Sequence, residues 1–273
     1  MPKKLKLALV LFAVFLLVEN MIVINLMNAR KKAPPVKKTP AGVAAKKTPK
    51  KPPVFQGNIA IVLDDWGYNL NSLPFIEEIK YPLTISILPY LPYSKTVAGE
   101  LHARGFELIL HLPLEPHERF SLEHNTIMTT MKEDEILAIL RKNLEDIPFV
   151  KGVNNHMGSK ATTDEKTMGV IFGELKKRRL YFLDSFVSLN SVCAGLAERM
   201  NIPFAKRDIF LDNKSDPEYI KAQLYKLKTK AKMYGEAIGI GHDRKTTVQV
   251  LREMMPVLER EGYRFVFVSQ LLN

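Results

Sequence analysis

From Asn58 to the C-terminus, short apolar runs rich in β-branched residues alternate with longer stretches in which apolar positions recur every three or four residues. The short runs predict buried strands, and the longer stretches predict amphipathic helices. The predicted strands are residues 59–63, 83–88, 106–112, 152–157, 180–185, 202–211, 237–242 and 264–269. The predicted helices are residues 73–79, 95–104, 133–146, 164–178, 191–200, 217–232 and 246–261.

This alternation is typical of parallel strands joined by helices, because such strands are covered on both faces and read as continuous apolar runs. The number of units predicts an α/β fold, a distorted (β/α) barrel of about seven parallel strands. An open, doubly wound sheet is the alternative. In either architecture ligands bind at the carboxyl ends of the strands, so polar residues at those ends are the candidate site residues.

The N-terminal part has a different pattern. Residues 1–29 begin with "MPKKLK" and continue into the apolar stretch Leu5–Met27, which is long enough to span a bilayer. No A-x-A-like cleavage site follows, which favours a signal anchor over the alternative, a cleaved signal peptide. Residues 30–53, rich in Lys, Pro and Ala, predict a disordered linker. The predicted folded domain is therefore residues 54–273, held by a membrane anchor on the outer side, in the cell envelope.

The net charge of +11 belongs to the N-terminal segment. Residues 1–53 contain 12 Lys or Arg and one acid, Glu19, so the predicted domain is formally neutral. This distribution argues against a nucleic-acid partner for the domain. The one cysteine, Cys193, excludes an intramolecular disulfide and a multi-cysteine metal site, and we expect it to be a core residue.

Two adjacent carboxylates, Asp64 and Asp65, directly follow the first predicted strand. Neighbouring carboxylates repel each other unless a positive group lies close by. Because side chains alternate along a strand, a bound cation would contact one aspartate and leave the other, pointing elsewhere, free to accept a proton. The alternative is that Asp64 caps the following turn and Asp65 pairs with Lys or Arg.

Three of the six histidines also fall at the ends of predicted strands: His111, His156 and His242. One carboxylate and two imidazoles with an open coordination position are a typical catalytic zinc site, although such ligands also bind other divalent ions. The sequence therefore predicts a divalent metal, with zinc the first expectation. The remaining histidines have no predicted role: His102, His117 and His124.

The segments "AIVLDDWGYN", "LTISILPYLPYS", "ELILHLPLEP", "GVNNHMGSKAT", "FLDSFVS", "IPFAKRDIFLD" and "AIGIGH" follow one another in the chain. In this order they resemble the divergent polysaccharide deacetylases, distant relatives of the NodB-type carbohydrate esterases. The resemblance covers roughly residues 56–273. It implies a distorted barrel, a divalent metal that is usually zinc, and an envelope or extracellular protein.

The resemblance also implies catalytic roles. Asp64 matches the aspartate that acts as base in the related esterases, and His242 matches their late histidine, the general acid. Asp184 stands where the relatives have an acid near the wall of the active site.

For the metal, the resemblance implies Asp65 and His111 as ligands. The relatives carry a second histidine in an H-x-x-x-H pattern, but Glu115 stands four residues after His111 in this chain. We expect His156, from the next strand, to be the replacement ligand.

These residues favour a metal-dependent hydrolase that removes N-acetyl groups from an envelope glycan, such as peptidoglycan. A noncatalytic module that keeps the fold and binds glycan or protein is the alternative, and a metal phosphoesterase is the third hypothesis. The aromatic residues Trp66 and Tyr68 directly follow the two aspartates. They either stack on a sugar ring or pack the adjacent loop.

Overall fold

The computed structural model describes residues 54–118 and 121–272, and these belong to one compact unit. The predicted anchor and linker, residues 1–29 and 30–53, lie outside the described residues. Within the described ranges, no helix is both long enough and apolar enough to cross a membrane.

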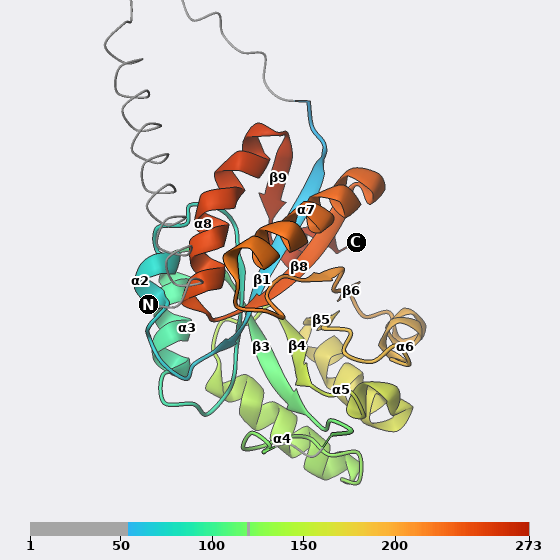
Figure 1. Ribbon diagram of the computed structural model, residues 1–273. Helices are drawn as coiled ribbons and strands as arrows, with labels where there is room; N and C mark the ends of the chain where they lie inside the picture. The colour runs from blue at the N-terminus through green and yellow to red at the C-terminus, as the bar shows by residue number, and fades with distance from the viewer. Residues whose placement is uncertain (1–53, 119–120, 273) are drawn as a thin grey trace, which may run out of the picture. The chain divides into compact units, whose positions relative to one another are not determined.

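The strands of the described residues form one nine-stranded sheet in which every pair is parallel (Figure 1). They are β1 (Gly57–Trp66), β2 (Thr84–Ile87), β3 (Glu107–Leu114), β4 (Gly152–Met157), β5 (Tyr181–Asp184), β6 (Phe204–Lys206), β7 (Ile209–Phe210), β8 (Glu236–His242) and β9 (Tyr263–Val266). The order is β6-β5-β4-β3-β2-β1-β8-β7, with β9 also paired to β1. The predicted parallel α/β fold is confirmed, and the nearly sequential order resembles a barrel more than a doubly wound sheet.

The sheet is an incompletely closed barrel. β6 pairs with β5 and β7 pairs with β8, but β6 and β7 are not paired with each other. Only Arg207 and Asp208 separate these two strands, and their amides bond to opposite neighbours, the carbonyls of Asp184 and Ile238. The single strand predicted over 202–211 is therefore two short strands, because one stretch of chain changes partners midway.

Helices connect successive strands and cover the outside of the sheet (Figure 1). They are α2 (Leu73–Ile76), α3 (Ser94–Ala103), α4 (Glu133–Asp146), α5 (Glu165–Arg178), α6 (Cys193–Met200), α7 (Pro217–Tyr234) and α8 (Lys245–Arg260), with the 3-10 turns η1 (Ala161–Thr163) and η2 (Val268–Leu271). Side chains of Asp164 and Asp216 cap the starts of α5 and α7 by accepting a backbone N–H. The helix predicted over 73–79 is shorter than expected, since Glu78 and Ile79 continue it only with i→i+3 bonds.

Alternate residues of β1 enter two different apolar cores. Ile59, Ile61 and Leu63 pack with the helices, whereas Ala60 and Val62 face the inside of the barrel. Both faces of the strand are thus buried, which is why its sequence reads as a continuous apolar run. Cys193 is buried, as predicted, in the core between the sheet and the helices, which we call the outer core.

Candidate active site

The two aspartates at the end of β1 both reach the mouth of the barrel. Because side chains alternate along a strand, Asp64 lies on the same inward face of β1 as Ala60 and Val62, and it is 2% exposed. Asp65 has a φ of +66°, in a stretch where the pairing of β1 with β2 is irregular. Its side chain therefore does not point away as regular alternation predicts: Asp64 Oδ2 and Asp65 Oδ1 lie 3.9 and 3.1 Å from the same nitrogen, His111 Nε2.

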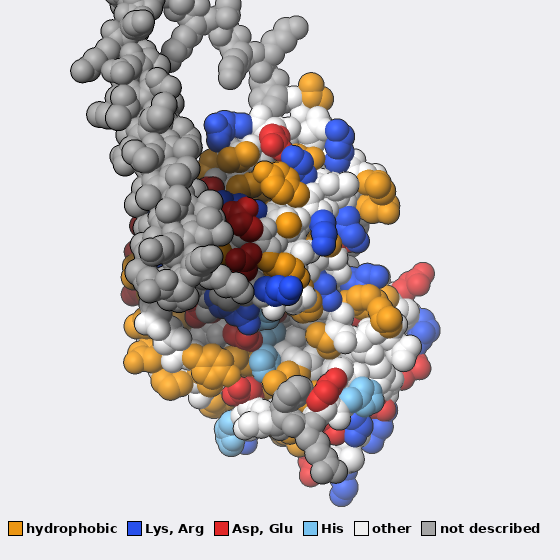
Figure 2. Space-filling model, in the orientation of Figure 1, with side chains coloured by type: hydrophobic (Ala, Val, Ile, Leu, Met, Phe, Trp, Pro, Cys, Tyr) orange, Lys and Arg blue, Asp and Glu red, His pale blue; other side chains and the backbone are white. Residues whose placement is uncertain are grey.

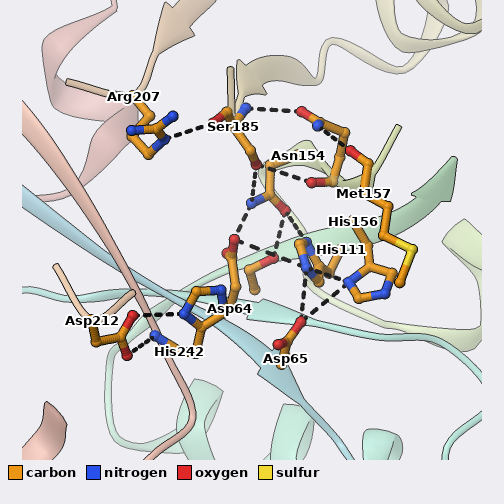
Figure 3. A network of polar contacts seen from close by, with 12 residues as sticks. Asp64, Asp65, His111, Asn154, His156, Met157, Ser185, Arg207, Asp212 and His242 are labelled. Atoms are coloured by element: carbon orange, nitrogen blue, oxygen red, sulfur yellow. Dashed lines mark hydrogen bonds and ion pairs between the residues drawn. The ribbon is translucent and has the colours of Figure 1, made fainter. Parts of the chain in front are cut away.

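Asp65, His111 and His156 form a compact group of potential ligands (Figure 3). β3 and β4 are paired with Pro113 opposite His156, so the two histidines come from adjacent strands. Asp65 Oδ1 lies 3.1 Å from His111 Nε2 and 3.2 Å from His156 Nδ1, and the two nitrogens are 3.1 Å apart. In a tetrahedral zinc site with bonds of about 2.1 Å, ligand atoms are about 3.4 Å apart. The three atoms therefore fit a divalent ion, with the ligand set expected from the sequence.

Asn154 links this group to Asp64. Its Nδ2 donates to Asp64 Oδ1 at 2.8 Å, and its Oδ1 accepts from the Ser86 hydroxyl at 2.5 Å. The amide orientation is fixed by these two bonds, so His111 Nδ1, 2.9 Å from Asn154 Oδ1, must be the protonated nitrogen. The other ring nitrogen of His111 then faces Asp65 and His156, as a metal-binding imidazole requires.

His242 lies at the end of β8, directly opposite Asp64 in the pairing with β1. Its Nδ1 bonds to Asp212 Oδ1 at 2.7 Å. Asp212 is fully buried and also accepts from the Thr247 hydroxyl and the His242 amide, so its position is fixed. The arrangement orients His242 and leaves its Nε2 as the nitrogen available for proton transfer.

These groups line one pocket of about 220 Å³. Its walls are formed by Asp64, Asp65, His111, Asn155, His156, Met157, Ser185, Val187, Phe210 and His242. A larger hollow of about 320 Å³ lies at the amino ends of β3 and β4, but its buried carboxylate, Glu107, is already bonded to Thr84 and Tyr181. The smaller pocket is the candidate active site, because it brings together five of the six residues predicted from the sequence.

The sixth residue, Asp184, is not part of the pocket wall. It is 1% exposed, and its carboxylate accepts from the Phe186 amide and the Ser191 hydroxyl. Asp184 therefore holds the loop after β5, and the neighbouring Ser185 and Val187 line the pocket in its place.

Glu115, which stands four residues after His111 where the resemblance implies a second histidine, also points away from the ligands. Its carboxylate accepts from the amide and hydroxyl of Thr129 and pairs with Lys160 at 2.7 Å. The alternative pairing of Asp65 with Lys or Arg is not found among the described residues, where its partners are histidines.

The electrostatics distinguish the two aspartates. Burial raises the pKa of Asp64, and nearby His111 and His242 offset this only in part. Burial alone would also raise the pKa of Asp65, but the bonds of Asp65 to His111 and His156 outweigh burial and lower its pKa. Burial opposes a charged His111 ring, yet the two aspartates raise its pKa to about 9. The space between the three ligands thus favours positive charge, whether a proton or a metal ion.

The aromatic residues after Asp65 have different environments. Trp66 is completely buried in the outer core, which confirms the packing interpretation for this residue. Tyr68 is 45% exposed and its hydroxyl donates to Glu123.

Sequence analysis did not identify Asn154, Asp212 or Phe210 as site residues. Two signals were present: Asp212 follows an apolar run as Asp64 does, and Asn154 shares a strand face with His156. Phe210 gave no such signal, because an aromatic residue within an apolar run is expected to be a core residue.

The sequence also matches a known protein family. The family model for divergent polysaccharide deacetylases matches residues 61–272. The chain belongs to this family. The match includes all six predicted site residues, from Asp64 to His242.

Two uncharacterized proteins are similar to this member of the divergent polysaccharide deacetylase family. YibQ of Escherichia coli K12 is 34% identical over 221 residues, covering 81% of this chain and 69% of YibQ. The crystal structure of ATU2773 from Agrobacterium tumefaciens C58 has a TM-score of 0.77 at 22% identity, covering 80% of this chain and 90% of that one.

A more distant structure is BA3943 of Bacillus anthracis, described as a CE4 family pseudoenzyme. It has a TM-score of 0.52 at 16% identity and covers 82% of this chain and 70% of its own. At such identities the two crystal structures establish the shared fold alone.

Proposed function

We propose that this protein is a metal-dependent hydrolase that removes N-acetyl groups from a glycan of the cell envelope. The observation that carries the proposal is the division of one pocket into a ligand group, Asp65 with His111 and His156, and two flanking proton-transfer groups, Asp64 and His242. A divalent ion at the ligand group supplies Lewis acidity, which polarises an amide carbonyl and lowers the pKa of water.

The protein's own residues handle the protons. Asn154 occupies Asp64 Oδ1, so Oδ2 is the oxygen that accepts the proton of the attacking water. Asp212 holds His242 Nδ1, so Nε2 donates a proton to the sugar nitrogen as the C–N bond breaks. The products are acetate and a free amine.

Two substitutions test this division of roles. We expect His111→Ala to lose bound metal by a large factor, whereas Asp64→Asn keeps metal and loses turnover by about 10²-fold or more, the contribution of a positioned general base. Metal content and acetate release from N-acetylated glycan fragments are the measurements. His102→Ala, on a histidine stacked against Phe149 outside the pocket, is the matched control. Equal metal loss in His111→Ala and Asp64→Asn, or full retention in His111→Ala, contradicts the assignment.

A noncatalytic glycan- or protein-binding module is the second candidate function. The observation in its favour is that Glu115 stands in place of the relatives' second histidine and is bonded elsewhere. Wild-type protein that binds metal but releases no acetate from any N-acetylated glycan tested would favour this alternative.

We further propose that the chain is anchored in the membrane, with residues 54–273 on the outer side. The apolar stretch Leu5–Met27 and the missing cleavage site support this proposal. Protease added to spheroplasts should degrade the domain. A mature N-terminus near residue 30 would show instead that the segment is a cleaved signal.

A further inference from the structure

The hollow of about 320 Å³ at the amino ends of β3 and β4 lies at the opposite end of the sheet from the active-site pocket. We call it the amino-end hollow. Aromatic side chains, one acid and one base contribute to its lining: His102, Gly105, Phe106, Glu107, Leu108, Phe149, Lys151, Phe267 and Ser269. None of these residues takes part in the proposed reaction.

The acid of the amino-end hollow, Glu107, is a buried carboxylate. Many charged side chains of the protein are exposed, as the blue and red side chains on the face drawn in Figure 2 show, whereas Glu107 is 7% exposed. By alternation along β3 it shares the inward face of the strand with Ile109 and His111. Its hydrogen-bond partners among the described residues are neutral donors, so no Lys or Arg compensates its charge directly.

Three donors bind one oxygen of this carboxylate and leave the other free. Oε1 accepts from the hydroxyls of Thr84 and Tyr181, each at 2.9 Å, and from the amide of Ser269 at 3.3 Å. Burial and the charge of Glu107 raise the pKa of Tyr181 well above its usual value, so the Tyr181 hydroxyl remains a donor. Oε2 accepts no hydrogen bond from the described residues. The carboxylate is therefore fixed in position, with one oxygen available to a ligand in the hollow that it lines.

Phe149 lines the same hollow as an exposed aromatic ring. It is 53% exposed and has a φ of +68°, a left-handed conformation that is unfavourable for a bulky residue and favours Gly. Its ring is stacked on that of His102, with ring centres 4.0 Å apart and planes 4° apart. Neither burial nor backbone preference accounts for a large ring at this position, whereas contact with a ligand does.

Lys151 contributes the positive charge of the lining. Its amide donates to the carbonyl of Leu108 at 2.8 Å, which places it on the strand end next to Glu107. Its side chain is exposed and forms no ion pair with a carboxylate of the described residues. The two charges therefore border one hollow without neutralising each other.

We propose that the amino-end hollow binds a small zwitterion, an amino acid whose ammonium and carboxylate groups are separated by an apolar stem. The ammonium group contacts Glu107 Oε2, the stem lies against the aromatic rings, and the carboxylate contacts Lys151. The charge-assisted hydrogen bond to the fixed Glu107 contributes most of the specificity. This site is separate from the active-site pocket and does not depend on the function proposed for that pocket.

Three probes with similar stems test the proposal by ligand-detected NMR, with the full chain in phosphatidylcholine nanodiscs and empty nanodiscs as the blank. They are δ-aminovalerate, pentylamine and pentanoate. We expect saturable binding of δ-aminovalerate, weaker binding of pentylamine and the weakest binding of pentanoate. His111→Ala, which alters the active-site pocket, should leave all three unchanged.

Substitutions of the two charged residues test each contact. Glu107→Gln keeps an oxygen for the three donors and replaces the free oxygen by an N–H group, so affinity for δ-aminovalerate and pentylamine should fall by about tenfold or more. Lys151→Gln should weaken δ-aminovalerate by roughly two- to fivefold, because Lys151 is exposed, and leave pentylamine unchanged. Lys142→Gln, which removes an exposed cation from α4, is the matched control.

Phe149→Gly separates binding from stability. Glycine relieves the left-handed backbone, so Tm should not fall, whereas affinity for δ-aminovalerate and pentylamine should fall because the stem loses an aromatic contact.

Several results would overturn the proposal. These are the absence of saturable binding for all three probes, binding that survives Glu107→Gln, and binding that is lost in His111→Ala. Pentylamine binding as tightly as δ-aminovalerate overturns the contact with Lys151. Loss of stability in Lys151→Gln, with equal losses of affinity for both amines, would show that Lys151 is instead the internal partner of Glu107.

Discussion

Asn154 contacts both parts of the pocket, the acid-base group through Asp64 and the ligand group through His111. Side chains that orient metal-binding histidines typically change metal affinity 10- to 100-fold when they are removed. We therefore expect Asn154→Ala to weaken metal binding by about this factor, measured by titration calorimetry. Asn143→Ala, which removes another fully buried asparagine, from α4, controls for a general loss of packing. Unchanged metal affinity in Asn154→Ala contradicts the role of Asn154.

The pair Asp212–His242 gives a pH-dependent prediction. Burial disfavours the charged His242 ring, but the bond to Asp212 and its negative charge outweigh this and raise the pKa of His242. Protonated His242 therefore persists to higher pH, and activity that needs it is lost as the pH rises through this pKa. Asp212→Asn removes the charge, so we expect the alkaline limb of the pH profile of kcat/KM to move to lower pH.

NMR titration of the His242 ring checks the same shift without turnover. An alkaline limb that stays in place in Asp212→Asn, with an unchanged ring titration, would show that Asp212 does not control this proton.

At the residue scale, sequence analysis predicted which strand ends carry the chemistry but not how the side chains interact. Asp64, His111 and His242 were found because polar residues interrupt apolar runs. Asp65 reaches His111 because the backbone of Asp65 is left-handed, at a point where the pairing of β1 with β2 is irregular. The pattern of residues in the sequence does not predict this conformation.

Helices α4 and α5 are joined by a buried carboxylate, Glu174, which binds Arg141 and Arg178. The bond to Arg141 is the main cause that lowers the pKa of Glu174, to about 2. A carboxyl with a lowered pKa in the folded state contributes stability above its unfolded pKa, and this contribution is lost as the pH falls from about 4.5 to about 2.

Replacing the carboxylate tests this contact between the helices. We expect Glu174→Gln to lower the free energy of unfolding at pH 7 by roughly 1–3 kcal/mol, less than the pKa shift alone implies because both arginines are partly exposed. The difference from wild type, measured by urea unfolding, should shrink as the pH is lowered toward about 3. Glu165→Gln, whose exposed carboxylate pairs with Arg199, should change stability much less. A pH-independent difference would point to lost packing instead.

Elements governed by local pattern were predicted well. The bounds of α4 match the predicted 133–146, and α5 differs by one residue at its start. The break between β6 and β7 was not predicted, because it arises where Arg207 and Asp208 bond to two different neighbouring strands. Such a change of partner is a property of the tertiary structure, not of the apolar run in the sequence.

At the scale of the whole molecule, residues 54–273 are formally neutral and contain the complete set of described strands and helices, which indicates that they fold by themselves. We expect this fragment to be soluble and monodisperse on size exclusion, with a helical circular dichroism spectrum and cooperative thermal unfolding. An insoluble or unfolded fragment would show that the domain boundary at residue 54 is wrong.

The segment at the open side of the barrel, β6 with β7, is also the most weakly paired part of the sheet. β6 and β7 comprise three and two residues, whereas β1 is paired along both of its edges. Segments with few ladder bonds open locally far more often than central strands, without unfolding of the rest. The amides of residues 204–210 should therefore be among the first in the sheet to exchange with deuterium. Since Arg207 and Phe210 belong to this segment, a molecule resting against that wall restrains the opening, and slower exchange there reports occupancy of the pocket even when no reaction takes place.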